Sequence, residues 1–364
     1  MVIGAVGDVA LLHPPSGGLF RKGWDDADLR IANLEAPLTT GGQPAAKLIR
    51  LQSPPEAAAW LRDDLGCSAV SLANNHIMDW GRPGLESTLT ALEGARIGWA
   101  GAGMDLAAAT THRMLSVGGF NVAFLSWACT VPPGFRATER QAGMAAVRVR
   151  TSYAADPFVI DEQPGTPPWV HTEPWAEDVA VLERALRTAR AASDFVVLSL
   201  HWGVPPQWRS AFQGPLAEYQ EALAPRLAAA GADLVLGCHA HTVYGLQAFE
   251  RRLVCFSLGN YIFHPLASHH QFPLDTPSRP YRAAELPENR DTFVGTFHLE
   301  KGPDDRLRIY QAAFFPAVLD DNWEARASDP ETTKSIATRL RAFSAERATE
   351  TELQEGGLLW SPMA

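Results

Sequence analysis

Short apolar runs that end in a polar side chain of metal-ligand type recur along this chain, and they limit the folds that it can adopt. Residues 2–6 run directly into Gly7 and Asp8, and residues 194–200 run into His201. Apolar runs of this length, with helix-like segments between them, predict an α/β fold built on buried strands. In open α/β sheets ligands bind beyond the carboxyl ends of the strands. The pattern therefore predicts a binding site at one edge of a sheet.

Predicted strands and helices alternate over most of the chain. Periodicity and turn residues predict strands over 2–6, 28–33, 67–72, 97–100, 121–127, 194–200, 233–236, 253–258, 292–299 and 307–315, and helices over 54–65, 84–94, 177–192, 215–230 and 331–350. Pro-rich insertions near 131–175 and 265–290 interrupt this order, and we interpret them as lids or binding loops. Residues 144–149 are the one strand predicted within the first insertion.

The domain organisation predicted from this order is simple. Residues 1–320 form one elaborated catalytic domain, because the sequence shows no internal repeat and no break in composition. Residues 321–364 form a helical tail that is loose after Gly356, apart from Trp360.

Composition excludes several classes of protein. A net charge of −10 argues against a surface that binds nucleic acid by neutralising phosphates. The four cysteines lack Cys-x-x-Cys spacing, which predicts free, buried thiols in a reducing compartment. The first strand follows Met1 directly, and no stretch reaches the roughly 20 apolar residues of a membrane-spanning helix. We therefore expect a cytoplasmic protein without a membrane anchor.

Two histidines, His239 and His241, stand two residues apart after the apolar run 233–236. In an extended segment the side chains at positions i and i+2 point to the same face. Two imidazoles placed in this way can hold one metal ion or a close pair of ions. A polar strand end that binds nothing shows the same pattern, so the interpretation depends on what the other strand ends carry.

Side chains of ligand type follow other predicted strands as well. Together with the two histidines they make a candidate metal site of Asp8, Glu35, Asn75, His201, His239 and His241. A set of carboxylates, an amide and imidazoles without a thiolate suits a borderline divalent ion such as Mn, Fe or Zn, and Mg and Ca are also compatible. Because successive β-α units bring these strand ends to one edge, we predict one or two divalent metal ions there.

Six stretches of the chain carry the same residues as the successive motifs of a known family. They are Gly7-Asp8-Val9, Asn33-Leu34-Glu35, Ala73-Asn74-Asn75-His76 with Asp79-Trp80-Gly81, His201-Trp202-Gly203, Gly237-Cys238-His239-Ala240-His241 and Ser257-Leu258-Gly259-Asn260-Tyr261. In this order, over roughly residues 1–300, the chain resembles CapA-type proteins, the poly-gamma-glutamate capsule synthesis relatives of the calcineurin-like metallophosphatases. The resemblance implies a four-layer α/β/β/α sandwich of the metallo-dependent phosphatase type.

The resemblance also implies roles for individual residues. One metal position would use Asp8 and His241, the other would use Asn75, His201 and His239, and Glu35 would lie between them. His76 would protonate or stabilise the reacting group. Ala10 replaces the histidine of the metallophosphatase Asp-x-His motif, so we expect a single ion or a weakly held second one. The chain also lacks the N-terminal anchor of capsule-synthesis members, which makes a role at the cell envelope less expected.

The sequence leaves the reaction open. Soluble relatives of this type include epimerases of lasso-peptide precursors, and this favours Cα epimerisation of a residue in a ribosomal peptide by metal-assisted proton abstraction and return. The alternative is metal-dependent hydrolysis of an amide bond of the poly-gamma-glutamate type, or of a phosphoester. A binding protein with a structural metal is disfavoured, because structural sites tend to be closed and rich in thiolates.

Four residues are candidates for acid/base chemistry on a peptide or amide-type substrate. His76 is the first, and Asp79 either takes part or only orients it. Cys238 and His264 are the candidates for a second group. Their alternative roles are a small buried filler for Cys238 and a structural strand-end residue for His264.

Overall fold

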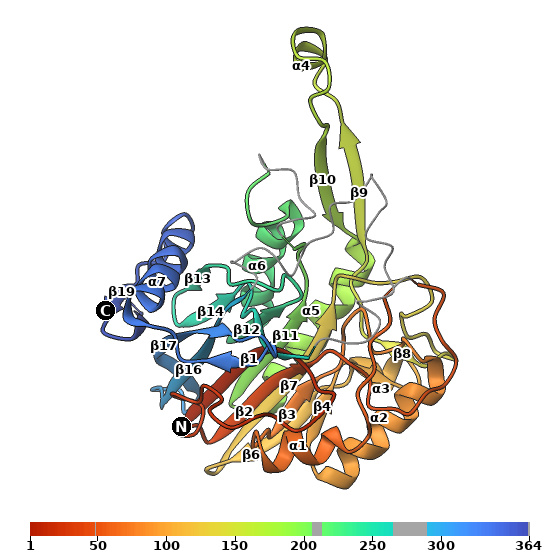
Figure 1. Cartoon of the computed structure of the whole chain (residues 1–364), viewed down its shortest axis with the longest axis vertical. Coiled ribbons are helices and arrows are strands. Elements are labelled where there is room, and N and C mark those ends of the chain that lie inside the picture. Colours follow the sequence, from red (N-terminus) through yellow and green to blue (C-terminus); the bar gives the residue numbers. More distant parts are fainter. Residues whose placement is uncertain (48, 206–212, 265–289, 363–364) are drawn as a thin grey trace.

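Two β-sheets lie face to face in the computed structural model, which describes residues 1–47, 49–205, 213–264 and 290–362 (Figure 1). The first sheet has the order β19 (Glu352–Gln354), β20 (Gly357–Trp360), β17 (Leu307–Leu319), β16 (Asp291–Lys301), β1 (Val2–Ala10), β2 (Leu29–Leu34), β3 (Ala69–Ser71) and β4 (Gly98–Ala100). In addition, β15 (Asn260–Phe263) pairs with β1, and β18 (Ala325–Arg326) pairs with β17. The second sheet has the order β13 (Leu246–Phe249), β14 (Arg252–Cys255), β12 (Leu234–Cys238), β11 (Phe195–His201), β7 (Phe120–Ala128) and β6 (Arg113–Val117).

Helices cover the outer face of each sheet, α1 (Ala57–Asp63) and α2 (Gly81–Ala95) on the first and α5 (Ala176–Ala192) and α6 (Glu218–Ala230) on the second. The other helices are α3 (Leu106–Thr110), α4 (Pro157–Glu162), which lies apart from both sheets, and α7 (Pro330–Ala345), which packs against the core between the sheets (Figure 1). Two short pairs complete the described structure, β5 (Ala102–Gly103) with β8 (Gly143–Met144), and β9 (Val149–Ala154) with β10 (Trp169–Pro174).

The four layers follow from the way side chains alternate along the strands. In β1, Ile3 lies in the core between the sheets, in one cluster with Val197 of β11. Val6 of the same strand lies in a separate cluster with Leu61 of α1 and Leu85 of α2. On the other sheet, residues of β11 cluster with the apolar sides of α5 and α6. Each sheet thus buries one face against the other sheet and one face against helices, and the predicted α/β/β/α fold class is confirmed.

Helix α5 illustrates why the predicted helices form. Val179, Leu182 and Leu186 recur at helical spacing and are fully buried against the second sheet. Glu177 and Asp178 lie in the first turn, where negative charge interacts favourably with the helix dipole. The structure places this helix at Ala176–Ala192, as the pattern predicts.

The first Pro-rich insertion is more regular than the sequence predicts. Strands β9 and β10 form an antiparallel hairpin that stands clear of the sandwich with α4 at its far end (Figure 1). The strand predicted over 144–149 is wrong, since only residues 143–144 and then 149–154 are extended. Hydrophobic periodicity reports a buried face, and nearly all of β9 is exposed. The second insertion lies outside the described residues, except Arg290.

The C-terminal segment also differs from the prediction. Helix α7 lies where expected, but the residues after it return to the first sheet as β19 and β20. Trp360 is buried, as expected, but Leu358 also pairs with Phe314 of β17 and is 2% exposed, so the tail is not loose around it. Strands of three or four residues are too short to show a period. The division of the chain at residue 320 stays a prediction.

Two further predictions concern cysteines and membrane helices. Cys67, Cys129, Cys238 and Cys255 are free and buried, as the sequence indicates. Among the helices of the described residues, none combines the length and apolar character needed to cross a membrane.

Candidate metal centre

Asp8 lies in the middle of the carboxyl-end edge of the first sheet. Its register partners are Asn33 on β2 and Asn260 on β15, both in parallel strands. The preceding residue must be glycine, because a Cβ atom on Gly7 would lie 1.8 Å from the carbonyl oxygen of Gly259. The Asp8 N–H donates to that same carbonyl oxygen at 3.0 Å. This close approach brings the turn before β15 beside Asp8.

The turn after β12 brings the two histidines of the His-x-His pair to this edge. His239 and His241 have φ angles of 92° and 53°, a backbone region that residues other than glycine rarely adopt. Such a conformation costs on the order of 1–3 kcal/mol per residue and is typical of functional sites. The His239 ring lies 4.7 Å from that of His201 and 5.9 Å from that of His241, measured between centroids.

Glu35, which follows β2, lies at the centre of the group. Its Oε1 atom is 3.8 Å from Nε2 of His76, 3.8 Å from Nε2 of His201 and 3.9 Å from Nε2 of His241. These distances are too long for hydrogen bonds. They fall within the roughly 4.2 Å that separates two ligand atoms on opposite sides of an ion with bond lengths of about 2.1 Å.

Three buried polar atoms at this point have no hydrogen-bond partner among the described residues. They are both carboxylate oxygens of Glu35 and Nδ1 of His239. Burial, and next the charge of Asp8, raise the pKa of Glu35 well above its usual range. A buried carboxylate without a partner costs several kcal/mol, a cost that a bound cation removes. The donor set therefore fits a divalent metal.

The ligand atoms fall into two groups that share Glu35. In each group, Glu35 with His201 and His239, and Glu35 with Asp8 and His241, the ligand atoms lie within 4.8 Å of one another. This division is the same as the one implied by the resemblance. Asn75 adjoins the first group, since its Oδ1 lies 2.8 Å from Nε2 of His201.

Further side chains orient the second group. Asn33 donates its amide N–H to Oδ1 of Asp8 at 2.7 Å, and the Ser71 hydroxyl donates to Asn33 at 2.6 Å. Nδ1 of His241 donates to Oδ1 of Asn260 at 2.8 Å, which leaves Nε2 facing Glu35. Burial opposes protonation of His241, but Glu35 and Asp8 outweigh it and raise the pKa to about 9. These orienting residues were not predicted, although a polar Asn33 inside an apolar strand is a detectable signal.

Ala10, where the metallophosphatase motif has a histidine, contributes no ligand. It is fully buried in a small apolar cluster with Ala36, Leu51 and Phe263. The group of Asp8, Glu35 and His241 therefore gains no ligand from position 10, and the expectation of a single ion or a weakly held second one stays a prediction.

His76 belongs to a chain of polar contacts beside Glu35. Its Nδ1 lies 2.7 Å from Oδ2 of Asp79, whose other oxygen forms an ion pair with Nζ of Lys47 at 2.6 Å. Burial lowers the pKa of His76 to about 4, so its ring is neutral at pH 7. Lys47, whose pKa burial also lowers, was not predicted as a site residue. It lies in a loop without periodicity, and a lone lysine there carries no sequence signal.

Cys238 and His264 lie at the same edge but differ in environment from His76. Burial, followed by the nearby charges of Asp8 and Glu35, raises the pKa of the Cys238 thiol well above its usual range. His264 accepts the Leu12 N–H on Nδ1 at 3.0 Å and contacts Glu324 through Nε2 at 3.0 Å. It follows Phe263, whose ring lies 5.2 Å from that of His241.

A third group of potential ligands, His13, His264 and Glu324, is already hydrogen-bonded. Glu324 accepts from Ser16 and forms an ion pair with Arg326. Both ring nitrogens of His264 are in use, and its ring stacks on His13 at 3.8 Å. Satisfied polar atoms give no reason to place a cation there, in contrast to the atoms around Glu35.

Comparison with known proteins gives several relatives of moderate similarity. Capsule biosynthesis protein CapA of Bacillus anthracis is 27% identical over 221 residues, which cover 61% of this chain and 46% of that protein. PGA biosynthesis protein CapA of Bacillus subtilis is 26% identical over 240 residues, covering 65% and 53%. A probable polyglutamine synthesis accessory protein of Mycobacterium tuberculosis is 28% identical over 251 residues, covering 67% and 58%. The chain thus spans about half the length of the curated relatives it matches.

Among solved structures, GAP50, the anchor in the inner membrane complex of Plasmodium, matches 100% of this chain and 99% of its own at 9% identity. Its TM-score of 0.33 is too low to support an argument about the fold. The names of the relatives above refer to capsule, PGA and polyglutamine synthesis, so the predicted epimerase branch is not confirmed. A family model described as bacterial capsule synthesis protein PGA_cap matches residues 17–265, more than half of the sequence, and the chain belongs to this CapA-type family.

Proposed function

We propose that this chain is a divalent-metal-dependent enzyme that acts on a peptide-type substrate, and that it epimerises a residue by exchanging its Cα proton. The observation that carries the proposal is a group of buried atoms of Glu35 and His239 that have no hydrogen-bond partner among the described residues. The Glu35 carboxylate also lies beside the imidazoles of His76, His201 and His241. An open centre of oxygen and imidazole ligands with a neutral histidine beside it is suited to acid/base chemistry.

The metal would be held by Asp8, Glu35, Asn75, His201, His239 and His241. Mn, Ca, Mg, Zn and Fe all accept such ligands, in one or two positions. When bound, a divalent ion supplies Lewis acidity that stabilises negative charge on a substrate carbonyl oxygen.

His76 is the proposed acid/base group on one side of the substrate. Its Nδ1 donates to Asp79, which leaves the lone pair of Nε2 directed toward Glu35, 3.8 Å away. A neutral ring can accept a Cα proton at Nε2, and the Asp79 carboxylate then stabilises the imidazolium that forms. Lys47 balances the charge of Asp79 and fixes its position.

Epimerisation needs a second group that returns a proton to the opposite face. Of the two candidates, Cys238 holds its proton tightly because burial raises the pKa of its thiol. His264 shares a proton with Glu324 at 3.0 Å, which makes a second histidine–carboxylate pair at the same edge of the fold. We therefore favour His264, which must release Leu12 or Glu324 to reach a substrate.

Hydrolysis of an amide bond is the second candidate function. The relatives named for capsule and polyglutamate synthesis favour it, since that polymer is joined by amide bonds. The same residues serve either reaction, because the neutral His76 ring can take a proton from the attacking water and pass it to the leaving amine, or exchange a Cα proton. Phosphoester hydrolysis is less favoured, because the histidine position of the metallophosphatase motif is occupied by the buried Ala10.

One incubation separates these reactions. The purified protein is mixed with a peptide and with Mn or Ca in deuterated buffer, with a chelator-treated sample as control. Deuterium at one Cα without cleavage is the expected result. Cleavage of the peptide with a mass increase of one water supports amide hydrolysis instead. Phosphate release from an aryl phosphate, assayed separately, supports phosphoester hydrolysis. Inactivity in all assays at saturating metal contradicts an enzymatic role.

A further inference from the structure

The hairpin formed by β9 and β10 is an arm with its own helical tip. The strands pair from Val149 and Pro174 at the base to Ala154 and Trp169 at the far end. Six residues of β-strand span about 20 Å. At the tip, the Asp156 side chain accepts the N–H of Phe158 at 2.9 Å and so begins α4.

The arm rises from the edge that carries the candidate metal centre. At its base the Val147 N–H donates to the carbonyl oxygen of Ala128, the register partner of His201. Farther up, the Thr172 N–H donates to the Glu218 carboxylate at the start of α6. The next residue of α6, Tyr219, accepts the N–H of Gly203, two residues beyond His201. The arm is therefore anchored beside the end of β11, whose last residue, His201, is a proposed metal ligand.

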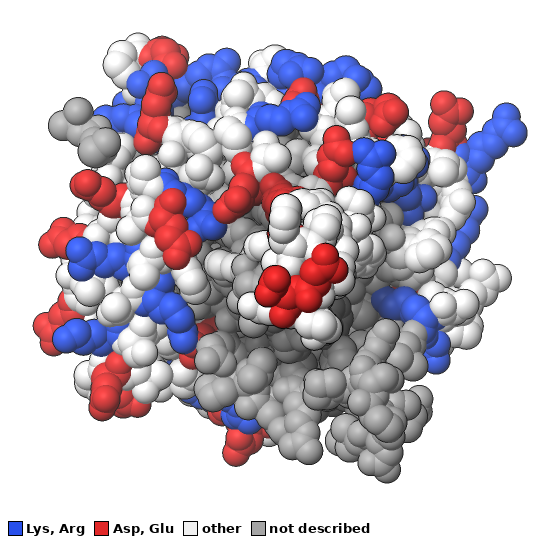
Figure 2. Space-filling model, turned by 90° about the horizontal axis from the view of Figure 1, so that it is seen from above, with Lys and Arg blue, Asp and Glu red and all other residues white. Residues whose placement is uncertain are grey.

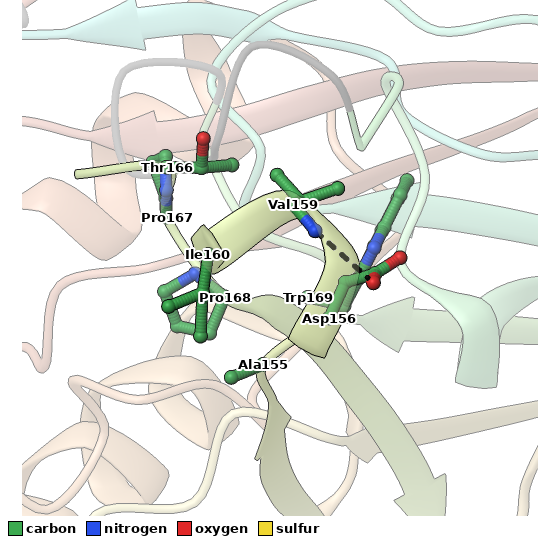
Figure 3. A pocket seen from close by; sticks show the side chains of 8 residues that line it. All are labelled: Ala155, Asp156, Val159, Ile160, Thr166, Pro167, Pro168 and Trp169. Atoms are coloured by element: carbon green, nitrogen blue, oxygen red, sulfur yellow. Dashed lines mark hydrogen bonds between the residues drawn. The ribbon is translucent and has the colours of Figure 1, made fainter. Parts of the chain in front are cut away.

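Large apolar side chains on the arm face solvent. Tyr153 is 71% exposed, Phe158 84%, Ile160 46% and Trp169 45%, and no residue of α4 is buried. Ile160, Pro168 and Trp169 line a cleft of about 150 Å³ at the tip (Figure 3). A concentration of exposed aromatic and aliphatic side chains on a projecting element is typical of a contact surface.

The charge of the arm indicates what it contacts. No Lys or Arg occurs between residues 151 and 183, whereas Asp156, Asp161 and Glu162 lie at the tip. Viewed down the arm, the tip shows acidic and uncharged atoms without basic ones (Figure 2). The whole chain carries a net charge of −10, so a second copy meets the tip with charge of the same sign on average. A polyanion such as poly-gamma-glutamate is repelled as well.

We propose that the outer part of the arm, residues 153–169, binds a segment of the peptide substrate. In this segment Lys or Arg stands beside aromatic or aliphatic residues. This inference rests on the proposed action on a peptide and specifies the class of peptide. Because an extended chain covers about 3.4 Å per residue, 20 Å of arm corresponds to roughly six residues. The recognised segment therefore lies at least about six residues from the residue that reacts.

The test measures binding without catalysis. A fluorescein-labelled peptide of about 12 residues that alternates Lys with Trp and Leu is titrated with the metal-free full chain, and anisotropy is followed at low and high salt. An oligo-gamma-glutamate of equal length is the anionic comparison. One variant replaces residues 155–168 with Asn-Gly, a two-residue turn that suits the Ala154–Trp169 pair. The second variant is D161K/E162K, which keeps the arm intact.

The expected result is that wild type binds the cationic peptide, that salt weakens binding, and that each variant loses about tenfold or more in affinity. The controls Tyr310→Ser and Asp321→Lys, at sites 42% and 98% exposed away from the arm, keep wild-type affinity. Unchanged peptide binding by both variants overturns the proposal. So does a wild-type protein that prefers the oligo-gamma-glutamate or that binds neither peptide. Variants that change only the oligomeric state of the protein also overturn it. If binding follows the prediction but no peptide exchanges deuterium, the proposed reaction fails while the arm proposal stands.

Discussion

The strand-end edge and the arm depart from ordinary protein architecture in opposite ways. At the edge, the Glu35 carboxylate and Nδ1 of His239 are buried without hydrogen-bond partners in the part of the chain that the structure describes. On the arm, aromatic groups such as Phe158 are exposed without a core to pack against. Buried polar groups and exposed apolar clusters are the two informative exceptions in a soluble protein. Each exception supports one of the proposed ligands, a cation at the edge and a peptide at the arm.

The two regions also differ in how firmly the fold determines them. The edge is built from parallel strands of two packed sheets, so its side chains are preorganised before any ligand binds. The arm is a two-stranded ribbon, which has little core of its own. Changes at the edge should therefore affect chemistry strongly, and changes on the arm should leave the fold intact.

The largest effect is expected for Glu35→Gln. Because both ligand groups share Glu35, we expect activity to fall by more than about 10⁴-fold, to background. The same change removes a buried carboxylate, so the variant should be more stable in chelator. We expect its free energy of unfolding to exceed that of chelator-treated wild type by about 1–3 kcal/mol. Thermal melting and deuterium exchange measure the two effects.

Glu300→Gln is the matched control for this prediction. Glu300 lies on β16 away from the arm, where its side chain is 50% exposed, and it should alter neither quantity. A Glu35→Gln protein that stays active, or that is less stable than wild type in chelator, contradicts the role given to Glu35.

Next in size is His76→Gln. Loss of a proton-transferring group costs about 10²–10⁴-fold in rate, whereas the stabilisation that added Mn gives should persist, because His76 is not among the proposed ligands. Steady-state rates and melting with and without Mn separate the two. Loss of the Mn effect means that His76 binds metal. His112→Gln, outside both the arm and the candidate metal centre, is the control.

The layers, and the meeting of the candidate ligands at one edge, could be predicted from the sequence for a physical reason. Buried strands and amphipathic helices leave periodic patterns, and parallel strands that end in Asp8, His201 and His239 must meet at one edge. Lys47, Asn260 and the β9–β10 hairpin were not predicted. Their positions depend on tertiary contacts or on an exposed ribbon, which leave no hydrophobic period.

A smaller effect is expected for Lys47→Met. Lys47 contacts Asp79 and His76 but is not a proposed metal ligand, so its loss should leave metal binding unchanged. Removal of a group that orients a catalytic side chain typically costs about 10–100-fold. The decrease should appear in kcat more than in KM. Partial recovery with Lys47→Arg, which keeps the positive charge, distinguishes positioning from a packing defect.

The smallest effect is expected for Phe158→Ala on stability. Because the side chain is 84% exposed, its loss should change the free energy of unfolding by no more than about 0.5 kcal/mol. Phe124→Ala, in the core between the sheets, should cost about 3–5 kcal/mol. Urea denaturation compares the two. A large loss for Phe158→Ala means that the arm packs against its own chain and is not a docking surface.

Calorimetric titration of Mn into chelator-treated protein is the most direct test of the metal centre. We expect wild type to bind at least one equivalent, and the Glu35→Gln variant to lose that binding while Glu300→Gln keeps it. Absence of binding to wild type, or equal binding to Glu35→Gln, contradicts the assignment of these strand ends to a metal.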